Sequence, residues 1–68
     1  MNNVIELYNN NKDLYTDTRT LINDYVKKER TKLFNDELEA EEYAKKTLTY
    51  PYDVYNEHNK HVGFAVPK

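Results

Sequence analysis

Apolar and polar residues alternate in two runs in the last third of the chain, Tyr50–Tyr55 and His61–Val66. A polar stretch, residues 56–60, separates the two runs. Two alternating runs joined by a polar connector are typical of a β-hairpin with one covered face. We expect the side chains of Tyr52 and Val54 to point to one face of the first strand and those of Asp53 and Tyr55 to the other. In the return strand Val62, Phe64 and Val66 should share the face that another element covers.

The apolar positions between Leu14 and Leu33 instead follow the period of an α-helix. At about 100° per residue they fall within one arc of roughly 140°, with polar residues on the opposite side. Thr16 or Asp17 can cap the start of this helix by accepting a hydrogen bond from a free amide. The pattern predicts a first long helix over about 17–34. Its apolar face would consist of Leu14, Leu21, Ile22, Tyr25, Val26 and Leu33.

A second helix is predicted over about 36–48. Asp36, followed three residues later by Glu39, resembles a capping box at a helix start. Two glutamate–lysine pairs spaced four residues apart support the same helix. One uninterrupted helix over 17–48 is the alternative. The apolar stripe changes phase near Asn35 and Asp36, and this break favours two helices.

The N-terminal cluster of Val4, Ile5, Leu7 and Tyr8 is closed by three asparagines, which favour a turn. Periodicity does not distinguish a short helix from a strand over residues 3–9, and we interpret this element as a helix. The whole chain, residues 1–68, is therefore predicted to be one small α+β domain with a short N-terminal element, two α-helices and a C-terminal β-hairpin. We expect the first long helix to cover the hairpin, with Leu21, Ile22, Tyr25, Val26 and Phe64 in the core.

Composition restricts the classes of function. The chain has 68 residues, no cysteine, a net charge of −2 and a pI of about 5.6. A core this small is thin, and the lack of cysteine fits an intracellular protein without disulfides. The negative net charge opposes coating of nucleic acid, which depends on neutralising phosphates. No apolar run approaches the roughly 20 residues of a membrane span, and no secretion signal is recognisable.

We therefore expect a cytoplasmic protein without membrane contact. The sequence is rich in asparagine, lysine and tyrosine, with eight lysines against two arginines. AT-rich genomes favour this choice of residues. We expect a phage or mobile-element origin in a low-GC bacterium.

Three tyrosines, Tyr50, Tyr52 and Tyr55, lie within the first hairpin strand or next to it. Tyrosine is enriched in recognition surfaces because it offers a large contact area and a polar tip with few rotatable bonds. These three residues are the predicted partner-binding site. AT-rich coding and the preference of tyrosine for strands are the alternative explanation.

A basic run, Lys27, Lys28, Arg30 and Lys32, stands at the end of the first predicted helix. It is the candidate site for the alternative function, a small nucleic-acid-binding regulator. Cations at a helix C-terminus also complement the helix dipole without any ligand. The carboxylates that follow from Asp36 would repel phosphates, so we expect nucleic acid not to be the partner.

The hairpin connector contains Glu57 and His58, and His61 follows closely, which are residue types that bind divalent metals. A connector is polar because it is solvated, and we expect no metal here. Neither histidine has a neighbouring serine or cysteine to activate, so the sequence predicts no catalytic residues, no cofactor and no enzyme.

These features together predict a small non-enzymatic binding or regulatory protein that acts through protein–protein contacts. A hairpin of two strands leaves at least one edge without a partner, and an open edge invites strand addition. We therefore expect a homodimer, together with a protein partner that the sequence does not identify.

Overall fold

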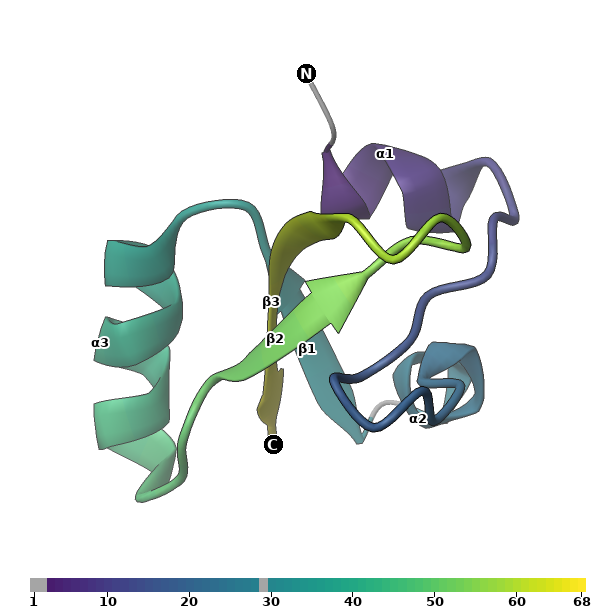
Figure 1. Ribbon diagram of the computed structural model, residues 1–68. Coiled ribbons are helices and arrows are strands. Elements are labelled where there is room, and N and C mark those ends of the chain that lie inside the picture. The colour runs from purple at the N-terminus through teal and green to yellow at the C-terminus, as the bar shows by residue number, and fades with distance from the viewer. Residues whose placement is uncertain (1–2, 29) are drawn as a thin grey trace.

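The computed structural model describes residues 3–28 and 30–68. Its strands form one antiparallel sheet in the order β1-β3-β2, so the predicted α+β class is confirmed and the hairpin gains a third strand (Figure 1). The elements in chain order are α1 (Val4–Asn9), α2 (Asn23–Lys27), β1 (Thr31–Phe34), α3 (Glu37–Thr47), β2 (Tyr52–Tyr55) and β3 (His61–Pro67).

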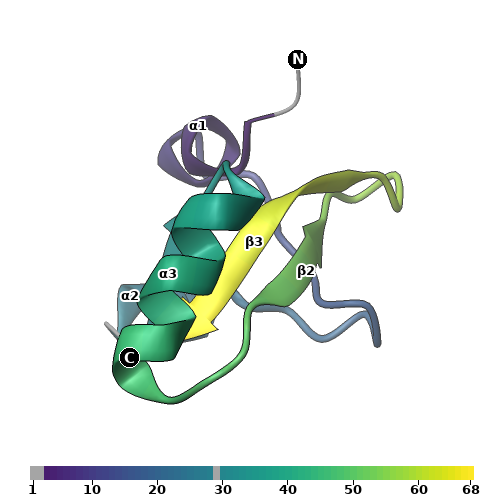
Figure 2. The ribbon, with the colours of Figure 1, turned by 90° about the vertical axis from the view of Figure 1, so that its left-hand side faces the viewer.

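Helices lie on both sides of this sheet. Figure 2 shows α3 in front of β3, and Figure 1 shows α1 and α2 on the opposite side. The central strand β3 supplies buried residues to both layers, as expected for a strand whose neighbouring side chains point to opposite faces. Under α3 the buried core consists of Phe34, Ala40, Ala44 and Val66; on the other face it consists of Val4, Leu14, Ile22, Val54, Val62 and Ala65.

The first long helix predicted over 17–34 is wrong. Among the residues described in that range only those of α2 are helical, and residues 31–34 form strand β1, which pairs with the end of β3. A turn precedes α2: the Thr16 N–H donates to the Thr20 carbonyl, and Arg19 has a φ of 64°. Threonine is a poor helix former and the left-handed region ends a helix, so this segment cannot continue as one.

The predicted core is only partly correct. Ile22 is buried, whereas Leu21 is 39% and Tyr25 44% exposed. Because α2 has only five residues, it cannot bring all the apolar side chains of the predicted helix face into contact with the sheet. The face of Phe64 and Val66 is covered by α3 instead of the predicted first helix.

The second helix is confirmed as α3. The Asp36 carboxylate accepts a hydrogen bond from the Leu38 N–H at 3.1 Å, so Asp36 is the N-cap. The helix ends at Thr47, and its C-cap, Leu48, is in the left-handed conformation with a φ of 56°. Because β1 precedes it, the single helix over 17–48 is excluded.

The N-terminal element is a helix, as interpreted from the sequence. Asn3 caps α1 by accepting from the Glu6 N–H at 3.0 Å. The side chain of Asn35, just after β1, accepts from the Val4 N–H at 3.0 Å. This bond ties the start of α1 to the end of β1. None of the described helices combines the length and apolar character needed to cross a membrane.

The hairpin of β2 and β3 contains a bulge. Val54 pairs with Gly63 but Tyr55 pairs with His61, so Val62 is the extra residue. The extra residue interrupts the alternation of side chains between the two faces of the sheet. The side chain of Val62 therefore belongs to the core on the side of α1 and α2. The prediction that Val62 shares a face with Phe64 and Val66 is therefore wrong.

Candidate protein-interaction surface

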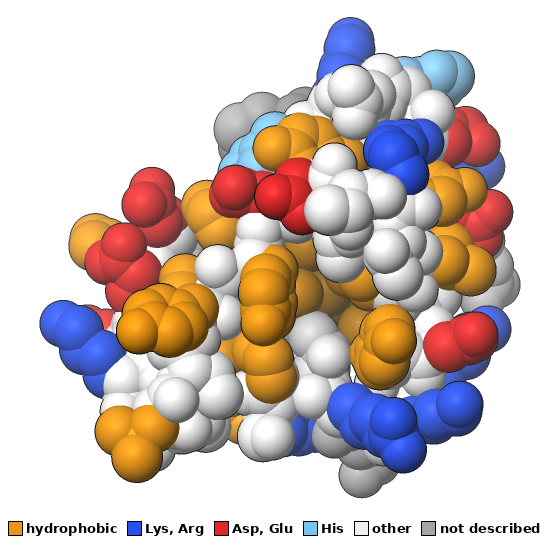
Figure 3. Space-filling model, turned by 60° about the horizontal axis from the view of Figure 1, so that its bottom comes forward, with side chains coloured by type: hydrophobic (Ala, Val, Ile, Leu, Met, Phe, Trp, Pro, Cys, Tyr) orange, Lys and Arg blue, Asp and Glu red, His pale blue; other side chains and the backbone are white. Residues whose placement is uncertain are grey.

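An apolar hollow with a volume of about 340 Å³ lies beside the start of β2. Figure 3 shows this face of the molecule, where apolar side chains surround a depression and cationic side chains gather near one border. We call it the tyrosine hollow. It is lined by Thr16, Ile22, Tyr25, Arg30, Thr31, Tyr52, Ala65 and Pro67.

Local structure explains why this hollow forms. Tyr52 pairs with Ala65 across the sheet, and the small alanine leaves space beside the larger ring. On the other side, α2 ends after less than two turns and leaves this end of the sheet uncovered. Tyr25 of α2 and Tyr52 of β2 remain 44% and 53% exposed. Two half-exposed aromatic rings thus flank an apolar floor.

The three tyrosines predicted as the partner site are not brought to one place. Tyr52 lines the tyrosine hollow, whereas Tyr50, 80% exposed, lines a different hollow between α3 and the start of β2. Tyr55 is half-buried, and its backbone N–H and carbonyl both pair with Tyr15, at 2.8 and 2.9 Å. Its ring packs edge-to-face on His61. Tyr52 and Tyr50 are thus available for contact, while Tyr55 also holds the fold together.

Tyr25 also belongs to this surface, which the sequence pattern did not predict. Its position on the apolar arc between Leu14 and Leu33 indicated a core residue. Once α2 is known to be short, the same arc places Tyr25 at the margin of the core. The sequence feature that could have revealed this is the series of alternate threonines before α2, Thr16, Thr18 and Thr20, because threonine disfavours a long helix.

The basic run is divided among separate surfaces. Lys27 lines a polar hollow next to α1, Arg30 lines the tyrosine hollow, and Lys32 lines a groove along β1. The Lys32 ammonium lies over the Tyr43 ring, 5.0 Å from its centre. Lys28 is exposed at the end of α2. These cations therefore do not converge on one hollow.

The histidines are also separated. His61 Nε2 lies 3.0 Å from Asp53 Oδ1 across the hairpin, while His58 lies 3.6 Å from Glu57 within the connector. Within residues 3–28 and 30–68 no three side chains of metal-binding type come together. The sequence cluster of Glu57, His58 and His61 is thus divided: Glu57 and His58 lie together, and His61 pairs with Asp53 instead.

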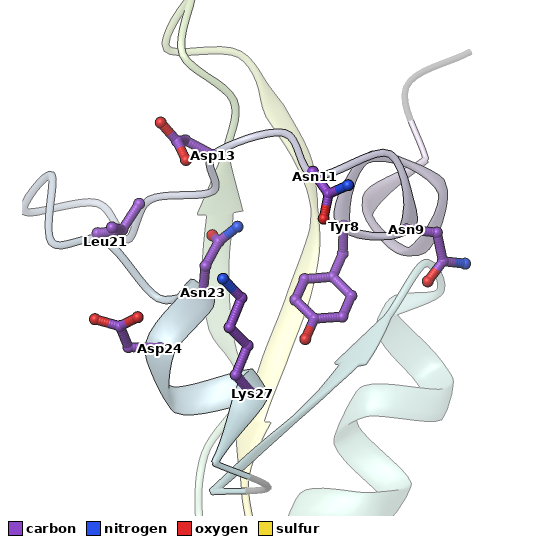
Figure 4. Close-up of a pocket in the computed structure, with 8 residues that line it drawn as sticks. All are labelled: Tyr8, Asn9, Asn11, Asp13, Leu21, Asn23, Asp24 and Lys27. Atoms are coloured by element: carbon purple, nitrogen blue, oxygen red, sulfur yellow. The ribbon is translucent and has the colours of Figure 1, made fainter.

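A polar hollow of about 280 Å³ lies between α1 and α2 (Figure 4). Asn23, the buried polar residue at its wall, accepts from the Leu14 N–H at 2.8 Å and donates to the Lys12 carbonyl at 2.9 Å. The carboxylates of Asp13 and Asp24 point away from Tyr8 in this view. The buried amide of Asn23 is thus engaged in holding the chain before α2 rather than offered to a ligand.

Comparison of the chain with protein-family models, with curated proteins and with solved structures found no match. Any function must therefore be argued from the surface itself.

Proposed function

We propose that this chain is a small, non-enzymatic binding protein that acts through protein–protein contacts. The observation that carries this proposal is the tyrosine hollow, where Tyr25 and Tyr52 stand half-exposed on either side of an apolar floor. Large apolar rings with polar tips gain contact area on binding without leaving a hydroxyl unpaired. Such rings are enriched at the centres of protein interfaces.

The charge distribution favours a protein over a nucleic acid as the partner. Strong phosphate binding needs several cations along one surface. Lys27, Arg30 and Lys32 line three different hollows, and Lys28 is exposed at the end of α2. The net charge of −2 acts in the same direction. The proposal also includes a regulatory role in the cytoplasm for a protein encoded by a phage or a mobile element.

We include self-association in this proposal. Further apolar side chains, Leu38, Leu48 and Tyr50, remain exposed in a chain of only 68 residues. Burial of such surplus area against a second copy would stabilise a small domain. A homodimer through the tyrosine hollow is the form that we expect first.

A photo-crosslinker tests the contact surface even while the partner is unidentified. Benzoylphenylalanine placed at position 52, irradiated in an extract of the native host, should give a discrete protein adduct. The same group at position 38 is the matched control, because Leu38 is exposed on α3, across the sheet. Tyr25→Ser should weaken the adduct formed from position 52. Equal adducts from both positions, or none from position 52, would contradict the proposal.

A further inference from the structure

The outer edge of β1 offers backbone groups that pair with no other strand among the residues that the structure describes. The Lys68 N–H donates to the Arg30 carbonyl at 2.9 Å, and the strand register continues this pairing to Lys32 and Phe34. Backbone groups alternate in direction along an antiparallel strand, so those of Thr31 and Leu33 point away from β3. Among the described residues no further strand lies beyond β1.

The opposite edge of the sheet is not equivalent. There Tyr15 pairs with Tyr55 through two backbone hydrogen bonds. Covering an edge with another segment protects it from strand addition, whereas a charged side chain stands on both edge strands, Asp53 on β2 and Lys32 on β1. The edge of β1 is therefore the more accessible one.

A groove of about 480 Å³ follows the edge of β1, between the two helical layers. We call it the edge groove. Helix α1 contributes two residues to its wall, α2 one and α3 one, so an added strand would lie between apolar side chains from both sides. The lining residues are Ile5, Tyr8, Val26, Thr31, Lys32, Leu33, Tyr43 and Lys68.

The two sides of the edge groove differ in chemistry. On the side of α1 and α2, Leu33 packs against the apolar core. On the side of α3, Lys32 shares a strand face with Phe34, and Lys68 shares one with Val66. Both charged residues among those described along the groove are thus lysines on one side. Side chains of an added strand would alternate between an apolar wall and a cationic one.

We propose that the edge groove binds an extended segment of a partner protein, by strand addition, in which apolar residues alternate with aspartate or glutamate. Main-chain hydrogen bonds to Thr31 and Leu33 supply general affinity, and the two walls select the alternating pattern. The carboxylates would meet Lys32 and Lys68. This proposal goes beyond the tyrosine hollow: the two surfaces share Thr31, but the other residues that line the edge groove do not line the hollow.

A second copy of the chain fits this edge poorly. Two β1 strands would have to pair through their outward residues. Thr31 opposite Thr31 sets Arg30 against Lys32, and Thr31 opposite Leu33 sets Lys32 against Lys32. Like charges directly opposite destabilise a sheet. Leu33 opposite Leu33 avoids this, but it sets Thr31 against Asn35, whose side chain holds α1. An acidic segment meets none of these obstacles.

Synthetic peptides test the proposal on the intact chain. The probe is a labelled peptide of alternating valine and glutamate, about seven residues long, titrated by fluorescence anisotropy. In a 15N-labelled protein its addition should shift the amide signal of Leu33, which lines only the edge groove, more strongly than that of Tyr52, which lines only the tyrosine hollow. A peptide of the same composition with its valines grouped together should bind about tenfold more weakly or not at all.

Backbone methylation provides a control that needs no variant of the protein. Methylation of one set of alternate peptide amides should abolish binding, because those amides donate to β1, whereas methylation of the other set should preserve it. Lys32→Glu should weaken binding of the valine–glutamate peptide about tenfold and favour a valine–lysine peptide. Lys60→Glu, in the hairpin connector, should leave the affinities for the valine–glutamate and the valine–lysine peptide unchanged.

Three results would overturn the proposal: equal binding of the grouped peptide, loss of binding with both methylated sets, or signal shifts confined to the tyrosine hollow. Self-association through the β1 edge that excludes the peptide would also overturn it.

Discussion

Gly63 stands where β3 approaches both β1 and α1. A Cβ built at this position would lie 2.7 Å from the Phe34 carbonyl oxygen and would collide with the Val4 side chain. Because the carbonyl belongs to the sheet backbone, it cannot move aside cheaply. We expect Gly63→Ala to lower the free energy of unfolding by about 1–3 kcal/mol, the usual cost of overpacking. Urea denaturation followed by circular dichroism measures it. Lys60→Ala, at an exposed position, is the control, and equal midpoints would show that the contact relaxes.

Ile22 and Tyr25 were both predicted as core residues, and the structure separates them. Ile22 is buried while Tyr25 is 44% exposed. Ile22→Ala should therefore cost about 2–5 kcal/mol. Tyr25→Ala removes a larger side chain yet should cost clearly less, because much of that ring already contacts water. Thermal melts of the two variants decide the order. A larger loss for Tyr25→Ala would restore the interpretation of Tyr25 as core and remove it from the contact surface.

At the scale of elements, the sequence predicted a helix or strand correctly where residues within or next to that element determine it. Asp36 at the start of α3 and the asparagine cluster after α1 act within a few residues, and both helices were predicted. Strand β1 was missed because four residues carry little periodicity, and what stabilises them is pairing with β3, about thirty positions away in the chain. Tertiary pairing overrode the apolar arc of the predicted first helix. The bulge at Val62 likewise depends on the partner strand.

The same locality predicts how α3 responds to loss of its cap. The Asp36 carboxylate accepts from the Leu38 N–H at 3.1 Å and lies at the positive end of the helix dipole. Asp36→Ala should destabilise the protein by about 1 kcal/mol. Asp17→Ala, in the exposed turn before α2, removes the same charge and should have little effect. Chemical denaturation of the two variants compares them directly. Equal destabilisation would mean that net charge, rather than the cap, accounts for the change.

The candidate site could be predicted only in part, because a contact surface depends on how the elements are placed in space. Tyr52 was predicted as a partner-binding residue, and its exposed fraction of 53% leaves it accessible for contact. The sequence offered no way to see that Tyr25 would face it across the tyrosine hollow. Nor did it show that Tyr50 would lie in a different hollow. Each of these placements follows from the short α2 and from the third strand.

The whole molecule is small enough for its exposed apolar rings to influence its state of association. If two copies pair through the tyrosine hollow, sedimentation equilibrium over a wide concentration range should give a dimer mass at the upper end. Tyr52→Ser should shift the dissociation constant upward by about tenfold or more, because such a ring lies near the centre of the contact. Leu38→Ser, which removes an exposed apolar side chain from α3, should leave the constant unchanged. A monomer mass throughout would exclude the homodimer and leave the hollow for a different protein. A dimer insensitive to Tyr52→Ser would place self-association on another face.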